Sequence, residues 1–303
     1  MNRSFFFFLL LISVCFHSCI TDIEEDRYIK PKLVLSCYLV PQLDTTILFL
    51  TSSAPLITSN PKPIESIANA IVEISNNSAH WVKMEYDSEN QVYFIPQTVF
   101  PIEEGKTYHV RASASGFETI SASCTVPWLR ETNLSLVVKE SINDIHWGKI
   151  YNELHYHSYL EWTDFPGEDN YYMFCNKEFY EEEWWDWHTN FPFEKDTFYF
   201  YRWNFLYDVD INTCIYSDKD NDGKKMSVLM IIGYPDIYEL TLLQMDRNCY
   251  LFETSIMNSI ADFQSFLLEP AAPLYTNIKN GYGVFGAFVM KDYSFELHNT
   301  PSH

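Results

Sequence analysis

Apolar and polar residues alternate in short stretches along the first part of the chain. The alternation is visible in residues 70–75 and 108–112, as expected of strands that bury one face and solvate the other. Turn-forming residues separate the stretches, for example Gly105. The pattern predicts an immunoglobulin-like β-sandwich over residues 28–127. Its expected strands are residues 32–40, 46–51, 70–75, 80–86, 92–95, 107–114 and 118–126.

Beyond Pro127 a stretch without a strong pattern precedes further β-rich runs, so we expect a second β-domain over residues 128–303. Within it, apolar residues three and four positions apart predict a helix over residues 246–268, which Asp246 can cap and Pro270 follows. The predicted fold class is mainly β: two β-sandwich domains, the second carrying one α-helix near the C-terminus. The expected strands of this domain are residues 134–139, 157–163, 171–176, 198–205, 227–232, 237–243 and 284–290.

The N-terminus has the three parts of a cleavable signal peptide. Arg3 supplies positive charge, residues 5–15 are apolar or small, and Ser18 provides a small residue for cleavage. The apolar run is shorter than the ~20 residues that a membrane-spanning helix needs. Cys19 follows at once and resembles the cysteine of the bacterial lipobox, which is lipidated and becomes the first mature residue. We therefore expect residues 1–18 to be a lipoprotein signal peptide and Cys19 to carry lipid; a secreted protein cut near Ser18 is the alternative.

Acidic residues follow Cys19 directly. Asp22, Glu24, Glu25 and Asp26 make residues 19–27 a solvated, self-repelling tether. The acidic residues at these positions resemble the signal that sends lipoproteins of Bacteroidetes across the outer membrane to the cell surface. We therefore expect the protein to be lipid-anchored in the outer membrane and to face the cell exterior.

Composition narrows the range of partners. The chain has 41 acidic against 20 basic residues and a formal charge of -21, so it would repel a nucleic-acid backbone. Its hydrophobic content of 47% indicates a folded body instead of a disordered one. The remaining mature cysteines are Cys37, Cys124, Cys175, Cys214 and Cys249, without zinc-ligand spacing. We expect buried free thiols with at most one disulfide, for which Cys37 and Cys124 are the candidate pair.

Several short segments resemble one known family across nearly the whole chain. They are KLVL (32–35), EGKTY (104–108), VP (126–127), FPGEDNYY (165–172), DGK (222–224) and NIKNGYGVFGA (277–287). Their order and spacing resemble the outer-membrane lipoproteins of Bacteroidetes catalogued as domain of unknown function 4249. The resemblance implies a two-domain, largely β envelope lipoprotein, often encoded beside a TonB-dependent outer-membrane transporter, with no established activity.

Aromatic residues are unusually dense in residues 178–207, where Trp184, Trp185 and Trp187 stand among acidic residues. Rings beside carboxylates could form a sugar-binding platform, and the same composition would suit a protein partner. The alternative is that the rings are core or edge cover of the second domain, because aromatic side chains are mostly buried. The three tryptophans are the predicted ligand-binding residues.

Asp218, Asp220 and Asp222 alternate before Gly223, as carboxylates do at the start of a calcium-binding loop. The twelfth position is Leu229 in place of the glutamate that an EF-hand needs, which excludes an EF-hand. A looser calcium site is the only cofactor that the sequence suggests. Acidic glycine turns between strands also occur for their backbone conformation alone.

The sequence contains no familiar motif of nucleophilic, zinc-dependent or nucleotide-dependent catalysis. Carboxylate pairs such as Glu182 and Asp186 arise by chance in so acidic a chain, so a glycan hydrolase is the weakest class. We expect a non-enzymatic surface lipoprotein that binds a ligand or docks on a TonB-dependent transporter. A structural or adhesive envelope protein that contacts another protein is the alternative.

Overall fold

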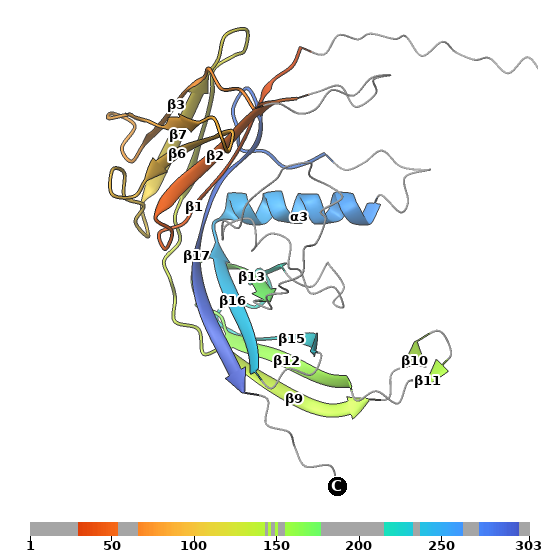
Figure 1. Cartoon of the computed structure of the whole chain (residues 1–303). Coiled ribbons are helices and arrows are strands. Elements are labelled where there is room, and N and C mark those ends of the chain that lie inside the picture. The colour runs from red at the N-terminus through yellow and green to blue at the C-terminus, as the bar shows by residue number, and fades with distance from the viewer. Residues whose placement is uncertain are drawn as a thin grey trace, which may run out of the picture.

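The computed structural model describes residues 30–53, 66–142, 145–146, 149–150, 155–176, 215–232, 237–262 and 273–296 (Figure 1). In this part of the chain, one helix, α3 (Arg247–Asp262), accompanies the strands. None of the described helical residues forms a segment long and apolar enough to cross a membrane. The strands are β1 (Leu33–Leu39), β2 (Thr45–Ser52), β3 (Ile71–Ser75), β4 (Val82–Lys83), β5 (Glu85–Asp87), β6 (Val92–Pro96), β7 (Thr107–Ser113), β8 (Ile120–Thr125), β9 (Ser135–Ile142), β10 (Ile145–His146), β11 (Lys149–Ile150), β12 (His155–Thr163), β13 (Tyr171–Asn176), β14 (Ile215–Ser217), β15 (Lys225–Ile232), β16 (Ile237–Met245) and β17 (Tyr282–Glu296).

One eight-stranded sheet runs through the described body in the order β14-β13-β16-β17-β1-β2-β6-β5. Its centre is β17, whose residues from Tyr282 to Ala287 pair in parallel with β1. The residues from Phe288 to Glu296 pair antiparallel with β16. Figure 1 shows β17 as a long curved strand that joins the two halves of the molecule. Strands from both sides of Pro127 therefore belong to the same sheet.

The parallel pairing of β17 with β1 depends on a glycine. Gly283 has a φ of +102°, a backbone conformation that side-chain-bearing residues rarely adopt. A Cβ at this position would lie 2.0 Å from the carbonyl oxygen of Leu35. Any other residue here would push the two strands apart.

The first sandwich packs β1, β2, β6 and the start of β17 against the four-stranded sheet β4-β3-β7-β8. Alternate residues of each strand enter its core, as the sequence pattern requires. β17 supplies Phe285, Ala287 and Val289, all fully buried. Each large apolar side chain buried in this way contributes about 1.5–3 kcal/mol. The C-terminal strand is thus part of the core of the N-terminal sandwich.

The second sandwich packs the three-stranded sheet β15-β12-β9 on the same face of the long sheet, further along β17. Its core centres on Trp162 of β12, whose ring meets Phe174 edge-on at 4.9 Å and Tyr172 at 5.5 Å between centroids. Tyr293 and Phe295 of β17 pack against this core. They have the same parity as Phe285, Ala287 and Val289, which is why both smaller sheets cover one face.

Helix α3 covers the opposite face of the long sheet, on residues of the other parity such as Val284 and Phe288. Cys249 and Phe252 are its buried contacts, in agreement with the predicted apolar stripe. Asp246 caps the helix, because its Oδ1 accepts the backbone N–H of Cys249 at 2.8 Å. The same oxygen accepts the N–H of Ala287 at 3.1 Å, which fastens the start of α3 to β17.

The predicted mainly β fold, with sandwich packing and a helix near the C-terminus, is confirmed. The expected strand 80–86 was wrong in one respect: it divides at buried Met84 into β4 and β5, which belong to different sheets. The expected strand 198–205 and the helix beyond Asp262 lie outside the described residues. The domain division after Pro127 stays a prediction.

Candidate functional site

Two acidic turns lie side by side at one end of the second sandwich. Residues 165–170 connect β12 to β13, and residues 218–224 connect β14 to β15. Each contains a glycine with positive φ, Gly167 at 86° and Gly223 at 66°. Asp, Asn and Gly favour such turns because their short side chains bond the backbone and because glycine accepts positive φ. The pairing of β12 with β15 brings the two turns together.

Asp164, at the end of β12, is buried between the turns. Its Oδ1 accepts the hydroxyl of Tyr172 at 2.6 Å, and its Oδ2 accepts the backbone N–H of Gly223 at 2.8 Å. Burial, and then the hydrogen bond to Asp164, raise the pKa of Tyr172, so the phenol stays protonated and donates. Asp164 therefore joins β13 to the second turn.

Asp218 is buried beside it and accepts the backbone N–H of Asn170 at 2.9 Å. Burial raises the pKa of Asp218 above its ordinary value, the charge of Asp164 adds to this, and the hydrogen bonds from Asn170 oppose it. Asp222 is exposed, and its Oδ1 accepts the backbone N–H of Gly167 at 2.7 Å. The first turn is thus held by two carboxylates of the second turn, and the second turn is held by Asp164.

One carboxylate oxygen from each of Asp164, Asp218 and Asp222 lies within 4.8 Å of the others. Hard cations such as calcium take six to eight oxygen ligands, so three carboxylates could supply part of a shell. The predicted set was Asp218, Asp220 and Asp222. The structure brings two of these together but leaves Asp220 exposed, with its carbonyl oxygen accepting the Lys224 ammonium at 3.0 Å.

Asp164 was missed because it comes from a distant strand. Its backbone N–H donates to the carbonyl of Lys224 at 3.0 Å, so it is a neighbour of the acidic turn only once β12 and β15 pair. The one sequence feature that could have indicated it is its place directly after the strand predicted over residues 157–163 and before the turn FPGEDN. Whether calcium binds here stays a prediction.

The linker between the sandwiches, residues 126–134 from the end of β8 to the start of β9, also contacts the first turn. The Arg130 guanidinium forms an ion pair with Glu168, 2.8 Å from Nη2 to Oε1, and lies 5.7 Å from the centroid of the Phe165 ring. Gln244 of β16 accepts the backbone N–H of Arg130 at 2.9 Å and donates to its carbonyl at 2.7 Å. The linker, the turn and the long sheet are therefore held as one unit.

Other predicted site residues have different outcomes. Cys19 and the ligand-binding candidates Trp184, Trp185 and Trp187 lie outside the described residues. The candidate disulfide is wrong: Cys37 and Cys124 are both buried free thiols. Burial raises the pKa of each thiol, which keeps it protonated and unreactive.

The described residues define a mainly β protein in which two sandwiches share one long sheet and two acidic turns form the candidate site. The chain belongs to the family described as domain of unknown function DUF4249, whose model matches residues 20–294. The resemblance seen in the short sequence segments is thereby confirmed. No curated protein matches the chain.

Proposed function

We propose that the protein is a lipoprotein anchored in the outer membrane through lipid on Cys19 and exposed at the cell surface. There it is a non-enzymatic accessory of a TonB-dependent transporter, on which it docks or to which it delivers a bound ligand. The transporter enters the proposal through the resemblance to envelope lipoproteins encoded beside such transporters. The family itself has no assigned function.

The observation that carries the proposal is the sequence around Cys19. A basic residue, an apolar run and a small residue precede the cysteine, and four acidic residues follow it closely. The family match begins at residue 20, directly after this cysteine. The residues between Cys19 and Lys30 span at most about 40 Å when fully extended. Such a tether keeps the body within reach of a partner in the same membrane.

The packing between the sandwiches supports a docking role. The Thr132 hydroxyl lies 2.6 Å from the hydroxyl of Tyr293 on β17, and Lys291 forms an ion pair with Glu131. These contacts, with those of Arg130, fix the linker to the long sheet. A body held in one shape loses little conformational entropy when it docks, so more of the contact energy appears as affinity.

Two linked measurements test the proposal. External protease on intact cells should digest the protein, and affinity purification of the lipidated protein from its outer membrane should recover a TonB-dependent transporter in stoichiometric amount. The variant Cys19→Ser should lose acylation, membrane attachment and the transporter together. Cys15→Ser is the matched control, because Cys15 lies within the signal peptide, and it should keep all three.

Other outcomes would select other functions. Protein that resists protease on intact cells and recovers no transporter would be a periplasm-facing structural lipoprotein. Stoichiometric recovery of a different protein, with no stabilisation by small molecules, would favour the adhesive alternative. Release of sugars from envelope glycans by the purified protein would overturn the non-enzymatic assignment.

A further inference from the structure

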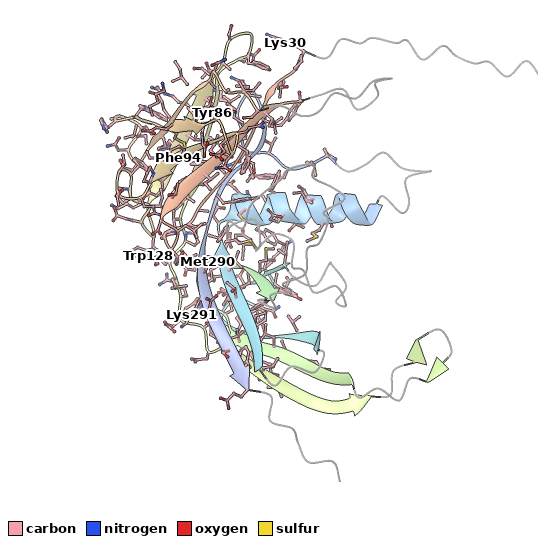
Figure 2. All side chains as sticks on the ribbon, viewed as in Figure 1. Lys30, Tyr86, Phe94, Trp128, Met290 and Lys291 are labelled. Atoms are coloured by element: carbon pink, nitrogen blue, oxygen red, sulfur yellow. The ribbon has the colours of Figure 1, made fainter. Side chains whose placement is uncertain are left out.

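Basic residues gather at one end of the first sandwich, although the protein as a whole is acidic. This is the end at which the described chain begins, and from it the sequence leads back to Cys19. Lys30, Lys32 and Lys279 are all exposed there, whereas the whole chain has a formal charge of -21. Tyr282, at the start of β17, lies beside them with 44% of its surface exposed. We call these four residues the tether end. Figure 2 labels Lys30 where the described chain begins, at the opposite end of the molecule from the three-stranded sheet.

The tether end is held in place by β-sheet contacts. Lys32 exchanges hydrogen bonds with Ser53: its N–H donates to Ser53 Oγ at 3.0 Å, and its carbonyl accepts the Ser53 N–H at 2.8 Å. Tyr282 pairs with Val34 of β1, two residues beyond Lys32. The Lys32 ammonium lies 5.1 Å from the centroid of the Tyr282 ring, a cation-π contact.

Lys279 is fixed at the same end by the turn that leads into β17. Its N–H donates to the carbonyl of Ser121 at 2.8 Å. The next residue, Asn280, donates from its side chain to the carbonyl of Thr119 at 3.2 Å. Glu118, on that neighbouring turn, is an exposed acid close to the cluster and opposes part of its charge. Of the residues named at this end, three carry positive charge and Glu118 carries negative charge.

We propose that the tether end rests on anionic lipid headgroups, so that the body stands on the membrane with the second sandwich pointing away from it. The inference depends on the proposed lipid anchor at Cys19. An amphipathic ring beside lysines suits a headgroup region, because the ring meets apolar material while the ammonium groups meet phosphate. Each lysine near an anionic surface strengthens binding roughly fivefold, or on the order of a hundredfold for three.

The acids of the tether itself, at positions 22 and 24–26, repel the same surface and cancel part of this attraction. The anchor compensates, since a short tether holds the body at an effective concentration on the order of millimolar beside the lipid. At that concentration a weak patch is enough to choose one orientation. The contact is therefore expected to orient an anchored protein, and not to recruit a free one.

The experiment uses the lipidated protein in vesicles of phosphatidylcholine and phosphatidylglycerol, with the same protein in neutral detergent as reference. Lysine acetylation rates are read by mass spectrometry. Lys30, Lys32 and Lys279 should react several-fold more slowly on vesicles. Vesicles of phosphatidylcholine alone should protect them less. Three other exposed lysines serve as internal controls and should keep their rates: Lys83, Lys106 and Lys219.

A matched pair of variants isolates the ring. Tyr282→Ala should reduce the protection of the three lysines, whereas Trp128→Ala, which removes an exposed aromatic ring elsewhere, should not. The same spectra report the acylation of Cys19. If Cys19 is acylated but the three lysines are acetylated at equal rates on vesicles and in detergent, the docking inference is overturned and the lipid anchor stands. Unacylated Cys19 overturns both, and protection seen only in native membranes shows that a protein covers this end.

Discussion

Asp246 offers the sharpest test of how α3 is attached. Burial raises the pKa of its carboxyl from 3.8 to about 6, although hydrogen bonds from Cys249, Ala287 and Asn248 pull it down. Because the folded state holds the proton more tightly than the unfolded chain, this group contributes stability below pH 3.8. That contribution is lost as the pH rises through about 6. A shift of about two units corresponds to roughly 3 kcal/mol, and partial solvent exposure reduces it to about 2 kcal/mol.

The variant Asp246→Asn keeps an oxygen that can accept the N–H groups of Cys249 and Ala287 but cannot ionise. We expect its free energy of unfolding, relative to wild type, to increase by about 2 kcal/mol between pH 4 and pH 7. Asp246→Ala removes the acceptor altogether. It should cost about 1–2 kcal/mol for the lost cap and a similar amount for the unbonded N–H of Ala287.

Urea denaturation followed by circular dichroism, repeated from pH 4 to pH 7, measures these differences. Asp220→Asn is the control, because Asp220 is exposed and lies in the turn between β14 and β15, away from the start of α3. Its stability difference from wild type should stay constant over the same range. A flat difference for Asp246→Asn would refute the reasoning, since it would mean that the buried carboxyl ionises as easily in the folded protein as in the unfolded chain.

Three further predictions concern other contacts. In the same denaturation assay, Gly283→Ala should lower the free energy of unfolding by more than about 3 kcal/mol, because the new Cβ clashes with β1. Gly116→Ala is its control: Gly116 also has positive φ but faces open space, so the substitution should cost about 1 kcal/mol. Gln244→Ala should cost about 1–3 kcal/mol and make the linker at Arg130 a site of limited proteolysis, because both its bonds to the linker are lost; an unchanged cleavage pattern would contradict this. Calcium should raise the melting temperature of the wild type and of Asp220→Asn but not of Asp222→Asn; no rise in the wild type would end the calcium prediction.

Local patterns predicted the strands well because each strand of a sandwich buries every second side chain, whatever its partners. Strands such as β1, β7 and β13 were found within a residue or two. The short strands β10, β11 and β14 were not, since two or three residues are too few to show a period. The helix start was found from Asp246, whose capping role is encoded locally.

Long-range pairing was beyond local patterns. Nothing in the sequence of β17 shows that its first half pairs with β1 and its second half with β16, because an apolar strand looks the same beside either neighbour in the sheet. The prediction of the acidic site was incomplete for the same reason. Asp218 and Asp222 share a turn and could be found together, whereas Asp164 joins them only through the pairing of β12 with β15.

The place of β17 in the chain bears on when this protein can fold. Its residues Phe285, Ala287 and Val289 are the last apolar residues added to the core of the first sandwich, yet they are synthesised after nearly all the rest. A contact between β1 and β17 closes a very long loop, and such contacts form slowly. The N-terminal sandwich therefore lacks part of its core until the C-terminal strand has been synthesised, so its folding waits for almost the whole chain.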